Sequence, residues 1–284
     1  MRNFKIKKRT KPIFISKAAF VNVTLIAGIT IFMALATVTG KLVSDNMLPS
    51  DSPVLNPQTP TPDVTPNAPD DATSKSISIR LDAKDYYFVQ FGVFSSLENA
   101  RSCANSIVSK GGAGYVKEIE GKHYVYAMSY TQNDDAKTVV SQLKSQGYST
   151  MLKRYSHSGL KVDLSGSPTT LDSLKNAIEG ISKIPDELET IIFDIDKGNL
   201  KGESITESLT QLKNKINGYL DILKLYSEQS GIFSGAAEYC TAVNADVEGV
   251  LELTENSSLS PSLKFVYINS IFELIEYLDN CVIE

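Results

Sequence analysis

The segment Tyr86–Phe94, with the sequence YYFVQFGVF, constrains the fold more than any other stretch of the chain. Read as a β-strand, it places Phe88 and Gln90 on one face. The residues of the other face would then be Val89, Phe91 and Val93. A strand with apolar or aromatic groups on both faces lies centrally in its sheet, and a glutamine there needs a hydrogen-bonding partner or a ligand. The segment therefore predicts a central strand that carries a candidate binding residue.

Residues 84–155 read as two similar halves, each made of a strand, a helix and a strand. The expected elements are strands at 86–94, 115–119, 123–130 and 150–155, with helices at 97–110 and 134–146. Right-handed crossovers then give a four-stranded antiparallel sheet in which the first and third strands are central. We therefore predict an α+β fold with ferredoxin-like β-α-β-β-α-β topology, both helices on one face of the sheet and the other face open.

The segment Tyr87–Phe94, YFVQFGVF, resembles the opening of the sporulation-related repeat, or SPOR, domain, whose pattern is approximately Tyr-x-Val-Gln-x-Gly-x-Phe. The second half matches more loosely. Where the family often reads Tyr-Arg-Val-x-Val-Gly-Pro-Phe, this chain has HYVYAMSY at 123–130, so that Tyr124 replaces the frequent arginine. Ala100 and Ala136 stand at the expected positions of the two helices. The resemblance covers about a quarter of the chain.

SPOR domains bind peptidoglycan and prefer glycan strands stripped of stem peptides, which occur where amidases split a septum. The resemblance implies the same ligand here, with Gln90 at the position of the family's characteristic glutamine. Aromatic rings on the same open face can stack on sugar rings, while an amide both donates and accepts hydrogen bonds. The predicted glycan-binding residues are Gln90, Phe88, Tyr124, Tyr126 and Met128. We expect Gln90→Ala or Tyr124→Ala to weaken glycan binding and to leave stability nearly unchanged, because both side chains should face solvent.

Two alternatives to an open glycan-binding face remain. A third layer, such as the C-terminal region, would cover Phe88, Tyr124 and Tyr126. Single-stranded nucleic acid is the other ligand that aromatic residues on central strands can stack against. The net charge of −5 argues against nucleic acid, because phosphate contacts dominate its affinity. His123 should point inward as a packed or edge residue.

The N-terminal part predicts a membrane anchor followed by a spacer. Residues 1–17 hold seven lysines or arginines and no acid, and the uncharged run Ala18–Gly40 is long enough to span a bilayer. The positive-inside rule keeps the basic tail in the cytoplasm and places the following domains outside it. A cleaved secretory signal, with a small-x-small site at Ala34–Ala36, is the alternative. The proline-rich residues 41–83 predict a disordered tether.

Residues 168–284 predict a helical bundle, joined to the sheet domain by a polar hinge at 156–167. Apolar residues recur at helical spacing in five stretches, which indicates four or five helices. From residue 156 onward the chain has 21 acidic and nine basic residues. This charge is typical of a solvated surface or of a site for a basic partner. We expect an unidentified protein partner for the bundle. A disulfide between Cys240 and Cys281 stays open.

Catalysis is not expected. The two histidines, His123 and His157, lie on a strand and in the hinge, whereas a zinc hydrolase needs about three ligands around one ion. We predict no metal and no cofactor. A transglycosylase needs one glutamate as an acid, and the bundle has several, such as Glu273, but acids on solvent-facing helix positions are ordinary. A cleft that holds a glutamate with a raised pKa would favour such an enzyme.

These observations predict a single-pass, non-catalytic cell-wall binding protein that localises to the division or sporulation septum. The order of anchor, linker, SPOR-like repeat and C-terminal region is weakly similar to that of the stage II sporulation protein B family, which acts at the sporulation septum. A septal scaffold that recruits a partner through its bundle is the main alternative. A cell-wall hydrolase is the third.

Overall fold

The computed structural model describes residues 74–253 and 256–281, with side chains omitted at 256–258. The expected membrane helix at 18–40 and most of the expected tether lie outside the described residues. Among the helices that are described, none is both long and apolar enough to cross a bilayer.

A four-stranded antiparallel sheet forms from β2 (Lys84–Phe94), β3 (Tyr115–Ile119), β4 (Lys122–Tyr130) and β5 (Met151–His157). Its order is β3-β4-β2-β5, so the first and third strands of the predicted repeat are central, as expected. Helices α3 (Leu97–Val108) and α4 (Asn133–Ser145) pack on one face. The predicted β-α-β-β-α-β order is confirmed.

A β-bulge interrupts the pairing of β2 with β4. The register shifts on either side of Gln90, and Val93 then lies opposite Tyr124. Paired residues of antiparallel strands share a face, so Val93 lies on the face of Gln90 rather than on that of Val89. The prediction from simple alternation was therefore wrong for Val93, because Phe91 is an extra residue on β2. It was also wrong for Met128, which pairs with Val89 and lies on that face, because Ala127 is an extra residue on β4.

A second, two-stranded sheet joins segments that the sequence predicted to be irregular. Strand β1 (Lys75–Leu81) pairs antiparallel with β6 (Leu160–Gly166), and the ribbon packs under α5. The end of the expected tether and the expected hinge are therefore strands. Ile79 and Leu81 are buried while their neighbours are exposed, which is the alternation typical of a β-strand. In so short a segment this alternation is weak evidence for a strand when the pairing strand is not known.

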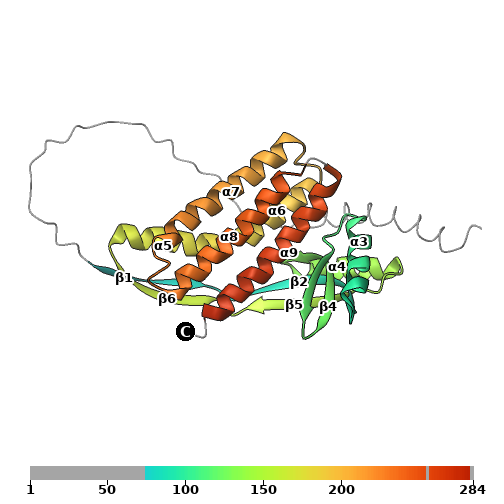
Figure 1. Ribbon diagram of the computed structural model, residues 1–284, viewed down its shortest axis with the longest axis horizontal. Coiled ribbons are helices and arrows are strands. Elements are labelled where there is room, and N and C mark those ends of the chain that lie inside the picture. The colour runs from blue at the N-terminus through green and yellow to red at the C-terminus, as the bar shows by residue number, and fades with distance from the viewer. Residues whose placement is uncertain (1–73, 254–255, 282–284) are drawn as a thin grey trace, which may run out of the picture.

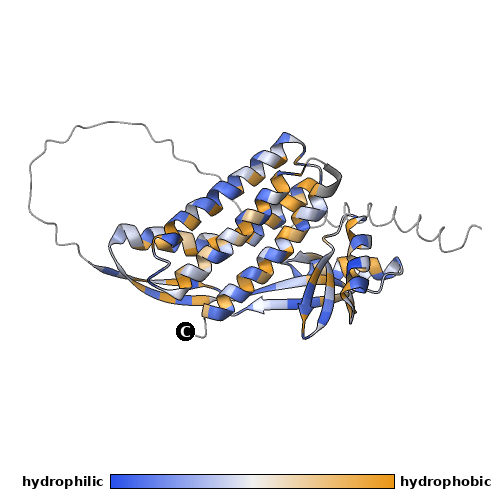
Figure 2. Ribbon diagram, viewed as in Figure 1, coloured by the Kyte–Doolittle hydropathy of each residue, from blue (hydrophilic) through white to orange (hydrophobic). Residues whose placement is uncertain are grey.

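The C-terminal region forms five helices within the described residues: α5 (Pro168–Ile181), α6 (Ile184–Asp196), α7 (Glu203–Lys224), α8 (Gly231–Leu251) and α9 (Asn256–Cys281). Ser167 begins the bundle as a helix cap, because its hydroxyl accepts a hydrogen bond from the backbone N–H of Thr170. Most of the large apolar residues of these helices are buried. Figure 2 shows hydrophobic and hydrophilic residues alternating along the helices of the bundle. The predicted helical bundle is confirmed.

Helix α9 connects the bundle to the sheet. It lies against β3, β4 and β5 on the face opposite α3 and α4 (Figure 1). Buried residues of the sheet and of the bundle belong to one continuous hydrophobic core. The expectation of an open second face was therefore wrong over the area that α9 covers.

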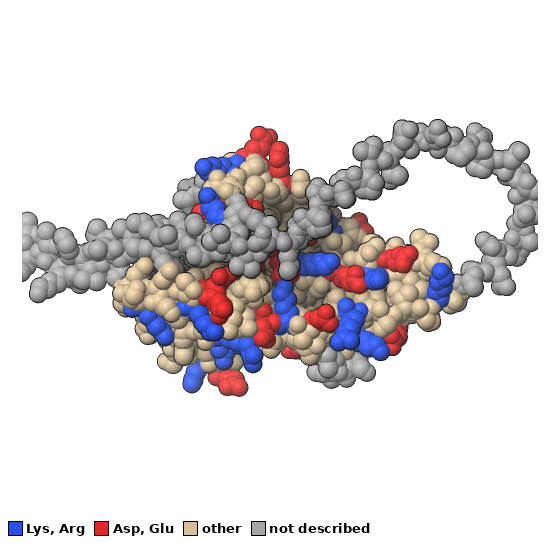
Figure 3. Space-filling view, turned by 180° about the vertical axis from the view of Figure 1, so that it is seen from behind, with Lys and Arg blue, Asp and Glu red and all other residues tan. Residues whose placement is uncertain are grey.

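Basic and acidic side chains are interspersed over the face of the molecule seen in Figure 3.

Candidate functional site

Helix α9 covers the part of the sheet face where glycan binding was predicted. The Phe272 ring lies 5.0 Å from the Phe88 ring and 6.0 Å from the Tyr126 ring, measured between centroids. Both Phe88 and Tyr126 are 0% exposed. Tyr155 of β5 completes the cluster, with its ring 5.0 Å from Phe272 and its hydroxyl hydrogen-bonded to that of Tyr126. We call Phe88, Tyr126 and Tyr155, together with Phe272 of α9 above them, the covered end of the sheet.

The other predicted ligands divide between buried and partly exposed positions. Met128 and Gln90 are buried, with 2% and 4% of their surface exposed. Tyr124 is half-buried and is the one predicted residue that reaches solvent appreciably. The third layer named as an alternative is therefore present over most of this face. Alternation identifies the side chains that share a face, but it contains no information on what packs against them.

Polar contacts hold α9 and α6 in place over the sheet domain. The Lys264 ammonium is 1% exposed, lies 2.7 Å from the Asp196 carboxylate and donates a 3.0 Å hydrogen bond to the Gly111 carbonyl. The Tyr115 hydroxyl donates to the Asn269 amide oxygen at 3.0 Å. Buried charges and hydroxyls are costly unless they have such partners. These contacts therefore fix the position of α9 on the sheet domain more specifically than apolar packing alone would.

Glu189 of α6 joins the bundle to the end of β4. Its carboxylate accepts hydrogen bonds from the Thr131 backbone N–H at 3.0 Å and from the Thr131 hydroxyl at 2.8 Å. Burial raises the pKa of Glu189, and the two hydrogen bonds oppose part of that shift. The sequence offered this glutamate only as one of many acids in the bundle.

The described residues leave another part of the same sheet face accessible. Val93 is 42% exposed beside Tyr124, and Met151, which pairs with Gln90, is 57% exposed. Lys117, opposite Tyr124 on β3, and Lys153, opposite Phe88 on β5, add ammonium groups on the same face. We call Tyr124, Val93, Met151, Lys117 and Lys153 the open end of the sheet. An aromatic ring, apolar side chains and hydrogen-bond donors together suit a sugar chain.

Sequence reasoning missed most of the open end. Met151 and Lys153 lie on a strand that the sequence did predict, so the register of β5 against β2 would have placed them on the face of Phe88. That register is a long-range pairing, and no short-range pattern in the sequence specifies it.

The histidines and cysteines form no catalytic group among the described residues. His123 pairs with Phe94 at the end of β4. His157 is buried, its Nδ1 accepts a hydrogen bond from the Gly159 backbone N–H, and burial lowers its pKa. Cys240 and Cys281 are not joined by a disulfide. In the described ranges, no cluster of His, Cys, Asp or Glu has the geometry of a metal site.

Comparison with known proteins gives a family match for the sheet domain. Residues 83–156 match the family model of the SPOR domain. The match confirms the predicted resemblance of this segment to the SPOR domain. It is also similar to the solution structure of the peptidoglycan binding domain of the B. subtilis cell wall lytic enzyme CwlC, with 26% identity over 25% of this chain and 91% of that chain and a TM-score of 0.24. No curated protein matches the chain. The SPOR match supports a cell-wall binding role, because SPOR domains are non-catalytic peptidoglycan-binding modules.

Proposed function

We propose that this chain is a membrane-anchored, non-catalytic protein whose SPOR domain binds peptidoglycan glycan strands at the open end of its sheet. The match of residues 83–156 to the SPOR family carries the proposal. The preference for strands without stem peptides, and a location at the division or sporulation septum, follow from the family resemblance. The basic residues at 1–17 and the uncharged run at 18–40 support an anchor with its N-terminus in the cytoplasm.

The open end can hold a sugar chain by two kinds of contact. The Tyr124 ring, together with Val93 and Met151, offers an apolar platform for the apolar faces of pyranose rings. The ammonium groups of Lys117 and Lys153 lie at the border with the covered end, over the Phe272 and Tyr155 rings, and can donate hydrogen bonds to hydroxyl, acetamido and carboxylate oxygens. Because α9 covers the adjoining part of the face, the bound stretch of glycan would be short.

The proposal is tested by sedimenting the whole chain with purified cell walls, before and after amidase removal of the stem peptides. We expect enrichment on the stripped walls. Tyr124→Ala should weaken this binding by about fivefold to tenfold, which corresponds to one lost ring contact. Tyr87→Ala is the matched control, since Tyr87 is a half-buried tyrosine on the opposite face of the same sheet.

Two results would contradict the proposal. If the folded chain binds neither wall preparation, the SPOR domain does not use this ligand. If Tyr124→Ala and Tyr87→Ala bind stripped walls equally well, the glycan does not lie at the open end.

A second role as a septal scaffold remains a candidate, because the bundle carries an acidic hollow between α8 and α9.

A further inference from the structure

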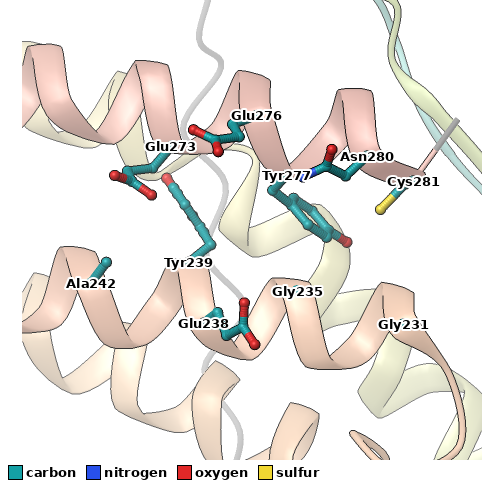
Figure 4. Close-up of a pocket in the computed structure, with 10 residues that line it drawn as sticks. All are labelled: Gly231, Gly235, Glu238, Tyr239, Ala242, Glu273, Glu276, Tyr277, Asn280 and Cys281. Atoms are coloured by element: carbon teal, nitrogen blue, oxygen red, sulfur yellow. The ribbon is translucent and has the colours of Figure 1, made fainter. Parts of the chain in front are cut away.

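Helices α8 and α9 leave between them a hollow with a volume of about 320 Å³. Glu238 of α8 lines one side, and Glu273 and Glu276 of α9 line the other (Figure 4). Glu273 is half-buried, while Glu238 and Glu276 are exposed at the rim. We call this hollow the acidic groove. It brings carboxylates from two helices to face a common space, which neither helix would do alone.

Tyr239 forms part of the floor of the acidic groove. The residue is 2% exposed, and its hydroxyl has no hydrogen-bond partner within the described part of the chain. Figure 4 shows the ring extending from α8 toward Glu273. A buried hydroxyl without a partner costs free energy, so it is retained more readily where a ligand supplies the missing hydrogen bond.

Tyr277 of α9 adds a second aromatic ring to the lining of the acidic groove. The Tyr277 ring lies against α8 at Gly235, where a Cβ atom would come within 3.0 Å of the ring. The groove thus combines two tyrosine rings with three carboxylates. Asn280 adds an amide at one end.

The electrostatics of the acidic groove are unfavourable without a cation. Partial burial, with the nearby carboxylates of Glu276 and Asp246, raises the pKa of Glu273, and only Lys117 acts in the opposite direction. A bound cation would relieve the repulsion among these carboxylates.

We propose that the acidic groove is a docking site for an arginine side chain of a partner protein. A guanidinium group is planar, has five donors and stacks on aromatic rings, so it matches carboxylates on two walls between tyrosines. A protein partner is favoured over the anionic cell wall because the chain from residue 156 carries 21 acidic and nine basic residues. This site would let one chain hold the wall and a second protein together, and Lys117 of the open end is close enough to Glu273 to act on its pKa.

A labelled hexa-arginine peptide provides the direct probe, with hexa-citrulline as its neutral, nearly isosteric control. We expect the whole chain to bind the arginine peptide and not the citrulline peptide, as measured by fluorescence anisotropy at physiological salt. Glu273→Gln should weaken binding about threefold to tenfold, as expected for the loss of one charge-assisted contact. Glu207→Gln, on the exposed surface of α7, removes the same charge elsewhere and should change binding little.

Tyr239→Phe separates docking from a structural role. Removing an unpartnered hydroxyl should leave the melting temperature unchanged or raise it, whereas peptide affinity should fall severalfold. A lower melting temperature with unchanged peptide affinity would assign the hydroxyl to the fold alone.

Three outcomes overturn the proposal. Equal binding of the citrulline peptide would show that charge is not recognised. An equal loss of affinity in Glu207→Gln and Glu273→Gln would show that the peptide responds only to the overall acidity of the bundle. Release of soluble sugar from cell walls by the wild type, abolished by Glu273→Gln, would make the groove a hydrolase site. Cell-wall sedimentation is measured in parallel, so failure of the docking site is distinguishable from failure of glycan binding.

Discussion

The covered end and the open end of the sheet are formed by the same strands, yet they have opposite roles. At the covered end, Phe88 and Tyr126 pack under Phe272 and belong to the common core of sheet and bundle. At the open end, Tyr124 projects from the same strand as Tyr126, two residues away, and remains partly accessible. An aromatic residue on a sheet face is therefore a binding residue or a core residue according to what lies above it.

The largest effect is expected from the aromatic cluster. Phe88→Ala should lower the free energy of unfolding by about 3–5 kcal/mol, because it leaves a cavity beneath Phe272. Chemical denaturation of the whole chain measures this loss. Val93→Ala at the open end, 42% exposed, is the control and should cost less than about 1 kcal/mol. Similar losses for the two variants would mean that the ends do not differ in burial.

A slightly smaller effect on stability is expected from Lys264 of α9, which pairs with Asp196 of α6 and donates a hydrogen bond to the Gly111 carbonyl of the sheet domain. Lys264→Met should cost about 3 kcal/mol, because Asp196 loses its cation and the Gly111 carbonyl loses its donor. Lys175→Met, which removes an exposed lysine 3.9 Å from Glu179, should change stability by less than about 1 kcal/mol. If Lys264→Met were equally mild, the contact between bundle and sheet domain would not be specific.

The pH dependence of stability tests the same junction at Glu189. Burial raises the pKa of Glu189 above its ordinary value of 4.5, so the folded chain holds this proton more tightly than the unfolded chain. Its contribution is most favourable below pH 4.5 and is lost as the pH rises through the raised pKa.

The measurement is urea denaturation across this range for the wild type and Glu189→Gln. We expect the wild type to lose stability relative to Glu189→Gln as the pH rises. Glu207→Gln should follow the wild type. A constant difference between wild type and Glu189→Gln at every pH would show that Glu189 titrates alike in the folded and unfolded chains.

The smallest stability effects are expected for Gln90→Ala and Tyr124→Ala, and they should differ because the two side chains differ in burial. The sequence predicted that neither substitution would change stability, but Gln90 is 4% exposed. We now expect Gln90→Ala to cost about 1–2 kcal/mol and Tyr124→Ala less than about 1 kcal/mol in thermal or chemical denaturation. Equal costs would place both residues in the core and remove Tyr124 from the candidate site.

The local pattern of the sequence was sufficient for the elements of the SPOR domain and for most of the bundle. Strand β3 was predicted with the bounds 115–119, and both helices of the SPOR domain were predicted to within two residues at either end. Alternation and helical spacing are short-range properties, so they can be read from neighbouring residues. The pairing of β1 with β6 was missed because its two strands are far apart in the chain.

The sequence by itself determined which residues of the central strands share a face of the sheet, apart from Val93 and Met128, which the irregular pairing beside Gln90 turns to the other face. Only the tertiary structure decided which part of that face binds and which part is core. Phe272 is one apolar residue among many in the C-terminal helices, and nothing in the neighbouring sequence assigns its contact to Phe88. Burial of an aromatic side chain is equally favourable against any apolar surface, so the choice of partner follows from how helices and sheet pack as a whole.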